Sequence, residues 1–242
     1  MGTKVMVLNV SIDAVTMPEA VARLENFIAE KKPHLVATAN AEMVMLAQED
    51  QELADILASC HLVVPDGAGV VWAARYQGYT MPERVAGYDL AQNLLAQAAE
   101  KGYRVFMFGT KPEIIEKAEN TALSRFPGLV IAGTRHGFFT KNDEAEIIAT
   151  INAAKPDILL AALGVPKQEK WLASNLDKLQ VPVCMGVGGT FDVMAGAVKR
   201  APLWMQRTGL EWSYRLIRQP QRLIRMTALP KFVMKVMLGK KC

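Results

Sequence analysis

Short apolar runs rich in β-branched residues alternate with amphipathic stretches along most of the chain. The apolar runs predict strands at residues 4–10, 34–38, 62–65, 103–108, 129–132, 157–163 and 181–185. Apolar positions at helical spacing predict helices between them, over residues 17–32, 41–59, 68–76, 88–101, 112–126, 143–154, 166–179 and 191–197. Thr16-Met-Pro-Glu19 predicts a capping box at the start of the first of these helices. This alternation indicates an α/β fold with a mainly parallel, Rossmann-like sheet flanked by helices.

The pattern changes after residue 202, where only helical periodicity continues and Pro220 and Pro230 interrupt it. We therefore divide the chain into an α/β catalytic body, residues 1–202, and a helical appendage, residues 203–242. An apolar stripe at helical spacing runs along the end of the appendage: Leu229, Phe232, Val233, Val236 and Met237. Such a helix can rest in a lipid headgroup layer or pack its stripe on the body, and periodicity leaves both open.

The appendage is strongly basic. It has nine Lys and Arg residues against the single acid Glu211, which gives it a net charge of +8. Because the whole chain carries +4, the body carries −4. A basic segment that also holds apolar residues, with Trp204, Trp212 and Tyr214 among them, favours an anionic membrane surface over nucleic acid as its partner.

Composition narrows the class of protein further. No stretch approaches the roughly 20 apolar residues that a membrane-spanning helix needs, and the N-terminus lacks the pattern of a signal peptide. The three cysteines are widely separated and form no ligand-spaced cluster with the three histidines. We therefore expect a cytoplasmic protein with reduced thiols and no metal or other cofactor, bound peripherally at the inner face of the cell membrane.

Ligands of open α/β sheets bind beyond the carboxyl ends of the strands. Several predicted strand ends carry polar residues or glycines instead of hydrophobic residues. These candidates are Thr38, Asn40, Asp66, Gly67, Gly109, Gly164, Gln168 and residues 186–192. Their clustering at strand ends is more informative than any single motif.

Asp66 is the strongest single candidate, because it directly follows an apolar strand and small residues follow it. A carboxylate there can act as a general base that takes a proton from an attacking hydroxyl. It can equally cap the helix that begins near Gly67, since Asp favours that position.

Gly186-Val-Gly-Gly-Thr-Phe-Asp192 is typical of a turn whose backbone N–H groups cradle a phosphate at a helix N-terminus, or of a tight strand-to-helix connection. It follows the last predicted strand instead of the first and lacks the lysine of a P-loop, so it is not a dinucleotide or P-loop fingerprint. Asp192 can hold ribose hydroxyls or cap the following helix.

Two further side chains are candidates for substrate contacts. Arg84 lies in a loop without apolar periodicity, where its guanidinium can pair with a diphosphate or face solvent. The amide of Gln168, in the first turn of a predicted helix, can hydrogen-bond a sugar. The appendage has four arginines spaced by three or four residues: Arg215, Arg218, Arg222 and Arg225. Pro220 is expected to end one helix and start another between them, and two arginines on either side of this bend can still converge on one diphosphate.

In their sum and order these motifs resemble the WecG/TagA/CpsF glycosyltransferase family over nearly the full chain. The blocks that carry the resemblance are Thr38-Ala-Asn40, Pro65-Asp-Gly-Ala-Gly-Val-Val-Trp72, Glu83-Arg-Val-Ala-Gly-Tyr-Asp89, Gly164-Val-Pro-Lys-Gln-Glu-Lys-Trp171, Gly186-Val-Gly-Gly-Thr-Phe-Asp192, Ala195-Gly-Ala-Val-Lys-Arg-Ala-Pro202 and Gly209-Leu-Glu-Trp-Ser-Tyr-Arg215. The resemblance implies an inverting, metal-independent enzyme of teichoic acid or surface polysaccharide synthesis. Its expected reaction moves N-acetylmannosamine from a UDP-sugar donor to N-acetylglucosamine on undecaprenyl diphosphate.

The resemblance also implies roles for individual residues. Asp66 is the expected catalytic base, and Thr38, Asn40, Arg84 and Gln168 line the substrate pocket. The remaining expected contacts are with UDP, through Gly186, Gly188, Gly189 and Asp192, and with the lipid diphosphate, through Arg215, Arg218, Arg222 and Arg225.

The chain departs from the family pattern at Gln219-Pro220, where an acid is expected before the proline, and at Ile224-Arg225-Met226, which replaces a more arginine-rich stretch. The donor also stays open, since N-acetylmannosaminuronic acid or glucose suits related pockets. Two alternatives come from other classes: a non-catalytic lipid-binding scaffold, and an NAD(P)-linked oxidoreductase, which the missing glycine fingerprint after the first strand disfavours. A homo-oligomer formed through the apolar appendage is a further open alternative.

Overall fold

The computed structural model of the chain describes residues 3–218 and 227–239. Six strands form one parallel sheet in the order β4-β3-β8-β7-β5-β6. In chain order they are β3 (His34–Ala39), β4 (Leu62–Pro65), β5 (Arg104–Gly109), β6 (Val130–Arg135), β7 (Ile158–Ala162) and β8 (Val183–Gly186). The last strand in the sequence, β8, therefore lies inside the sheet between β3 and β7.

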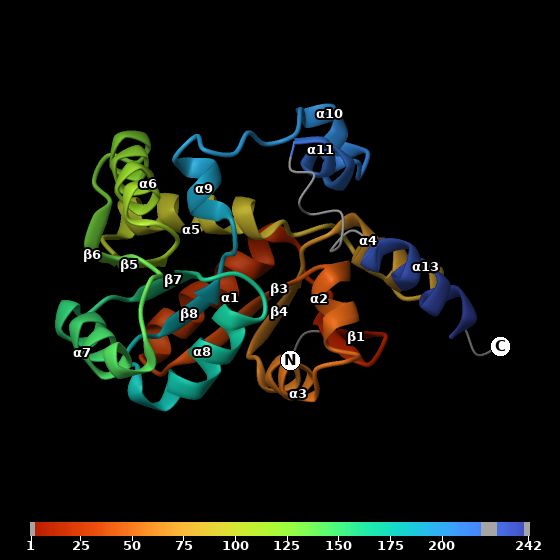
Figure 1. Cartoon of the computed structure of the whole chain (residues 1–242), viewed down its shortest axis with the longest axis horizontal. Coiled ribbons are helices and arrows are strands. Elements are labelled where there is room, and N and C mark those ends of the chain that lie inside the picture. The colour runs from red at the N-terminus through yellow and green to blue at the C-terminus, as the bar shows by residue number, and fades with distance from the viewer. Residues whose placement is uncertain (1–2, 219–226, 240–242) are drawn as a thin grey trace.

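Helices cover both faces of the sheet (Figure 1). One core contains residues of α1 (Met17–Glu30), α5 (Gly87–Lys101), α6 (Pro112–Arg125) and α9 (Thr190–Met194). The other contains residues of α2 (Ala41–Leu46), α3 (Gln51–Ser59), α4 (Ala68–Tyr76), α7 (Glu144–Ala154) and α8 (Lys167–Asn175). Side chains alternate between the cores along each strand, as Leu35 and Val36 do, because strand side chains point to opposite faces in turn.

The α/β class and the mainly parallel sheet predicted from the sequence are confirmed. The helical segment predicted over residues 41–59 consists of two helices, α2 and α3. The helix predicted over residues 166–179 consists of α8 and the 3₁₀ helix η2 (Leu176–Lys178). Another 3₁₀ helix, η1 (Lys141–Asp143), precedes α7. The capping box predicted at the start of α1 is also present, because Thr16 accepts a hydrogen bond from the Glu19 backbone N–H.

The prediction of a single first strand over residues 4–10 is wrong. This segment belongs to an antiparallel hairpin of β1 (Lys4–Val7) and β2 (Val10–Asp13), which forms its own two-stranded sheet. Leu8 and Asn9 turn the chain with φ angles of 45° and 65°. The buried carboxylate of Asp13 accepts hydrogen bonds from the Val63 N–H of β4 and from Arg23, so the hairpin covers the edge of the main sheet.

The appendage contributes α10 (Leu203–Arg207), α11 (Glu211–Arg218) and α13 (Ala228–Leu238). Pro230 lies in the first turn of α13 and does not interrupt it, because its missing N–H needs no partner there; Pro220 lies outside the described residues. Helix α13 packs on α2 and α4, burying Phe232 and Val236, while Val233 and Met237 stay exposed. The apolar stripe thus splits between the body and the surface. Among residues 3–218 and 227–239, no helix is long and apolar enough to cross a membrane.

Candidate active site

A cavity of about 310 Å³ opens at the carboxyl ends of β4, β3, β8 and β7, which are adjacent in the sheet. It gathers most of the strand-end candidates: Thr38, Asn40, Asp66, Gly164, Gln168, Gly188, Gly189 and Asp192. Gly109 does not line this cavity, because it ends β5, one strand further out, and Gly137 packs against it. The order of the strands therefore decides which candidates form the site.

Asp66 follows β4 and faces the cavity with its side chain 25% exposed. Its backbone N–H donates to the Ala39 carbonyl, which fixes the turn after the strand. The expectation that Asp66 is the N-cap of α4 is wrong, since that residue is Gly67. Asp66 precedes the cap and lines the cavity.

The end of β3 supplies two polar side chains. The buried hydroxyl of Thr38 donates to the Gly186 carbonyl at 3.4 Å, so it links β3 to β8 across the site. Asn40 is the N-cap of α2, because its Oδ1 accepts from the Met43 N–H at 2.9 Å. Both residues line the cavity, and each also holds the local backbone in place.

Gln168 connects the two glycine-containing turns of the site. Its Oε1 accepts from the N–H groups of Gly164, after β7, and Gly188, after β8, at 3.2 and 3.0 Å. Its Nε2 donates to Glu169 Oε1 at 2.8 Å. A side chain at Gly186 would meet this amide at 2.7 Å, so Gly186 packs behind Gln168 and does not line the cavity.

Glu169 is a buried carboxyl group behind the site, with only 2% of the residue exposed. Burial disfavours its charged form and raises its pKa to about 7, although the hydrogen bond from Gln168 acts in the opposite direction. The amide of Gln168 therefore hydrogen-bonds a carboxyl group, Glu169, whose pKa is near neutral.

The glycine turn leads into the short helix α9, whose N-cap is Gly189. Gly188 adopts a φ of 52°, a left-handed conformation that favours glycine, and a side chain there would meet no atom within 4 Å. Asp192 lines the cavity from the first turn of α9, so it is not the capping residue.

Arg84, in the loop before α5, lines the neighbouring cavity described below and not the strand-end cavity, but its side chain approaches Asp66. Its Nη2 lies 3.8 Å from Asp66 Oδ1 and donates to Glu211 Oε2 of the appendage at 2.7 Å. Glu211 Oε1 in turn lies 3.8 Å from Nε of Arg200, which makes a bidentate pair with Asp89. The pKa of Arg200 is raised: burial acts to lower it, and the hydrogen bonds and charge of Asp89 more than offset this.

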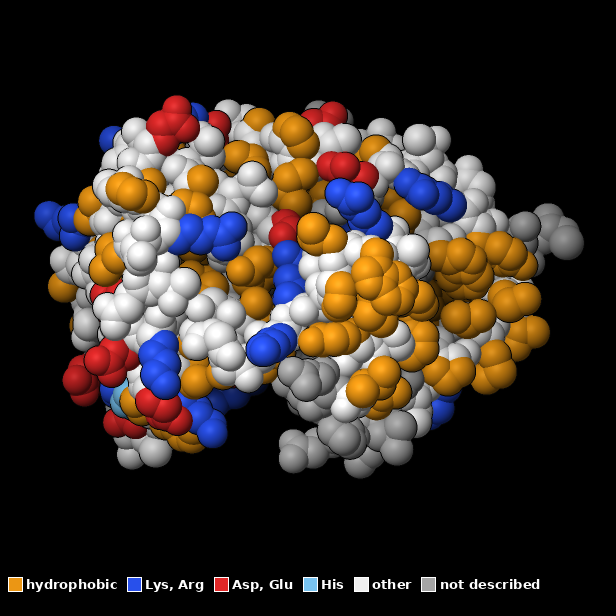
Figure 2. Space-filling view, turned by 90° about the horizontal axis from the view of Figure 1, so that it is seen from above, with side chains coloured by type: hydrophobic (Ala, Val, Ile, Leu, Met, Phe, Trp, Pro, Cys, Tyr) orange, Lys and Arg blue, Asp and Glu red, His pale blue; other side chains and the backbone are white. Residues whose placement is uncertain are grey.

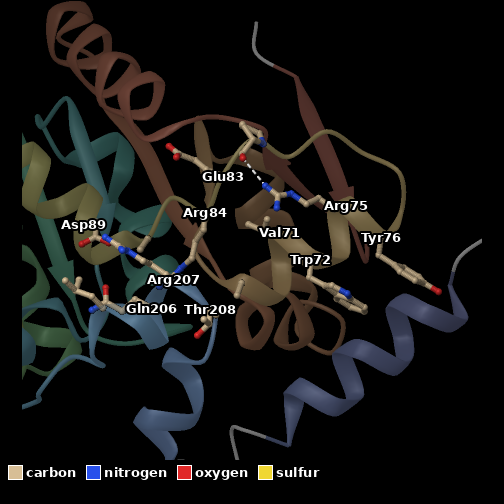
Figure 3. A pocket seen from close by; sticks show the side chains of 15 residues that line it. Val71, Trp72, Arg75, Tyr76, Glu83, Arg84, Asp89, Gln206, Arg207 and Thr208 are labelled. Carbon is tan, nitrogen blue, oxygen red and sulfur yellow. Dashed lines mark hydrogen bonds between the residues drawn. The ribbon is translucent and has the colours of Figure 1, made fainter.

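A second, larger cavity of about 930 Å³ lies on the other side of Arg84, between α4, the loop before α5 and α10. Figure 3 shows Trp72 and Tyr76 at one end, beside α13, and Arg84, Arg207 and Asp89 at the other. Arg75 donates to the Met81 and Pro82 carbonyls and so fixes the loop that carries Arg84. Charged side chains of both signs therefore line one end of this cavity, and aromatic side chains line the other.

The four arginines predicted to contact the lipid diphosphate fall only partly within the described residues. The backbone of Arg215 and Arg218 belongs to α11, and the structure does not describe their side chains. Arg222 and Arg225 lie outside the described residues. Sequence reasoning assigned no role to Asp89, Arg200 and Glu211. The signal that could have found Glu211 is its position as the only acid of a basic segment.

The side chains that could act as metal ligands are those of His, Cys, Asp and Glu. Within residues 3–218 and 227–239, no group of three or more His, Cys, Asp or Glu side chains is placed to hold a metal ion. The fold and the site define an α/β protein with a cavity at the carboxyl ends of a parallel sheet, which is where ligands of such folds bind. The carboxylate of Asp66 lines this cavity, and Arg84 lies beside that carboxylate.

The chain belongs to the WecG/TagA/CpsF family of glycosyl transferases, whose family model matches residues 5–241. The N-acetylglucosaminyldiphosphoundecaprenol N-acetyl-beta-D-mannosaminyltransferase of Bacillus subtilis (strain 168) is 37% identical over 217 residues, which are 90% of this chain and 84% of that relative. The Staphylococcus aureus (strain MW2) protein of the same name is 32% identical over 240 residues, 98% of this chain and 94% of the relative. The family resemblance and the glycosyltransferase class predicted from the sequence are confirmed.

Proposed function

We propose that this enzyme transfers N-acetylmannosamine from UDP-N-acetylmannosamine to N-acetylglucosamine on undecaprenyl diphosphate, with inversion at the transferred carbon and without a metal ion. The names of the relatives at 32–37% identity support the sugar and the acceptor. The observation that carries the mechanism is the carboxylate of Asp66 in the lining of the strand-end cavity, with Arg84 Nη2 at 3.8 Å.

In the proposed reaction, Asp66 takes the proton of the acceptor hydroxyl as its oxygen attacks the anomeric carbon of the donor. The bond from that carbon to the UDP oxygen breaks on the opposite side, which inverts the configuration. Arg84 offsets part of the charge that develops on the leaving diphosphate. UDP lies against the glycine turn and Asp192, and Thr38, Asn40 and Gln168 shape the sugar pocket.

The acceptor diphosphate enters from the larger cavity, on the far side of Arg84 from the donor. The arginines of its charged end, Arg84 and Arg207, suit the diphosphate, and its aromatic end, with Trp72 and Tyr76, suits the first part of the lipid. Arg215, Arg218, Arg222 and Arg225 complete the diphosphate contacts in this proposal.

The appendage holds the enzyme on the membrane. Figure 2 shows hydrophobic side chains gathered over the end of the molecule that α10, α11 and α13 form. The exposed ones are Leu203, Trp204, Leu210, Trp212, Ile217, Val233, Met234, Met237 and Leu238. Exposed apolar side chains next to lysines, such as Lys231 and Lys235, suit insertion into an anionic headgroup layer.

The test of the reaction is UDP release from UDP-N-acetylmannosamine with the lipid-diphosphate-linked N-acetylglucosamine acceptor. We compare the wild type, Asp66→Asn and a matched control at the exposed Asp177, Asp177→Asn, each with and without EDTA. Release that needs the acceptor, survives EDTA and disappears only in Asp66→Asn supports the proposal. Full activity of Asp66→Asn would refute the base, and a wild type active only with UDP-N-acetylmannosaminuronic acid or UDP-glucose would refute the donor.

Membrane attachment has a separate test, sedimentation with anionic phospholipid vesicles. Replacing the exposed Met237 and Leu238 by Ser is expected to weaken vesicle binding and leave the melting temperature unchanged, because neither side chain is buried. The control is Leu123→Ser on α6, a helix far from the appendage (Figure 1). Equal binding of all three proteins would refute the proposed surface.

A further inference from the structure

Glu211 is the only acid of the basic appendage, and it is buried against the body. Its carboxylate lies between two guanidinium groups of the body: Arg84 Nη2 is 2.7 Å from Oε2, and Arg200 Nε is 3.8 Å from Oε1. A buried carboxylate is costly unless it is paired, so this placement ties the start of α11 to those two arginines.

Arg84 joins this appendage contact to the reaction centre. The same Nη2 atom that donates to Glu211 lies 3.8 Å from Asp66 Oδ1, which is longer than a hydrogen bond. Arg200 cannot hold the guanidinium of Arg84 in place of Glu211, because Arg200 is itself a cation and pairs with Asp89. Arg75 hydrogen-bonds the backbone of the loop before α5 and does not contact the Arg84 side chain in these hydrogen bonds. The position of the Arg84 guanidinium therefore depends on Glu211 and Asp66.

The two carboxylates compete for one cation. Without the charge of Glu211, the guanidinium of Arg84 closes on Asp66, and the ion pair at 3.8 Å becomes a charge-assisted hydrogen bond. Such a hydrogen bond stabilises the ionised carboxylate and makes it a poorer proton acceptor. It also withdraws the guanidinium from the place where the leaving diphosphate develops its charge.

We propose that Glu211 is a positioning residue for the transfer reaction, which keeps Arg84 in a 3.8 Å ion pair with Asp66 and prevents a direct hydrogen bond between the two. This inference rests on the proposed function. Glu211 thus links the start of α11 to Asp66 through the Arg84 side chain.

The first experiment measures kcat and both KM values for the wild type, Glu211→Gln and Glu211→Asp with detergent-solubilised acceptor, so that membrane attachment plays no part. The control is Glu116→Gln at an exposed position of α6. We expect Glu211→Gln to lower kcat by about tenfold to a hundredfold, as small misplacements of catalytic groups do, and Glu211→Asp to retain more of it. An unchanged kcat, or a loss confined to the KM of the acceptor, would overturn the proposal, since the residue would then only anchor the appendage.

The second experiment does not depend on turnover. Phenylglyoxal modifies accessible arginines, and mass spectrometry gives the rate at each site. Arg84 is expected to react several-fold faster in the double variant Glu211→Gln/Asp66→Asn, which removes the charge of both carboxylates, than in Glu211→Gln, where Asp66 takes the guanidinium. The exposed Arg104 serves as the internal reference. Equal rates at Arg84 in these two variants would overturn the proposal. If the wild type releases no UDP while the two rates differ, the proposed function fails and the exchange of Arg84 between the two carboxylates stands.

Discussion

Glu169→Gln should remove a pH dependence of stability that the buried carboxyl group imposes on the folded protein. Burial raises the pKa of Glu169 from 4.5 to about 7. Between these two values the folded state binds a proton that the unfolded state releases, so the free energy of unfolding falls as the pH rises through this window. Above the folded pKa the loss is complete.

The magnitude follows from the size of the shift. One pKa unit corresponds to about 1.4 kcal/mol, so the wild type should lose about 2 to 3 kcal/mol between pH 5 and pH 8 through this group alone. Glutamine keeps the shape of the side chain and an oxygen that accepts from Gln168 Nε2, and it cannot ionise. The variant should therefore gain stability relative to the wild type as the pH rises.

Urea unfolding at pH 5, 6, 7 and 8 checks this expectation, because the titration of all other groups cancels in the difference between the two proteins. Glu146→Gln, at an exposed position of α7, is the control and should show no such trend. A difference between wild type and Glu169→Gln that stays constant from pH 5 to pH 8 would refute the reasoning, since Glu169 would then be ionised in the folded state at all of these values.

Three further perturbations test the packing of the fold and the site. Phe232→Ala should lower the free energy of unfolding by about 3 to 5 kcal/mol in urea titrations, because this side chain of α13 is buried where the helix packs on α2 and α4. Leu238→Ala, at an 86% exposed position of the same helix, should change it little. Gly188→Ala should cost about 1 to 2 kcal/mol and weaken UDP binding in calorimetry, since its φ is 52°; an equal effect of Gly189→Ala, which has no positive φ, would contradict this cause. Asp13→Ala should lower the melting temperature strongly, because it leaves Arg23 and the Val63 N–H without their buried partner, and a melting temperature within a degree of the wild type would disprove the role of this carboxylate.

Local signals in the sequence were sufficient where the interaction is itself local. The capping box at Thr16 and the glycine turn after β8 were both predicted, since each depends on residues within a few positions of one another. The prediction for the first strand was wrong, because strand pairing is not a local property. Nothing within residues 4–10 indicates whether the strand pairs with the main sheet or with the next strand in the chain. Asp66 stayed ambiguous between base and cap until the structure placed the N-cap at Gly67.

The sequence by itself determined the α/β class, the family, the strand-end candidates and the basic character of the appendage, because periodicity, motifs and net charge are properties of the chain. Only the tertiary structure decided that β8 lies beside β3, which brings Thr38 to Gly186 and leaves Gly109 outside the site. It alone brought Glu211 across 127 positions to Arg84. Such pairings depend on how helices and strands pack in three dimensions, and no spacing along the chain records which buried charge will meet which partner.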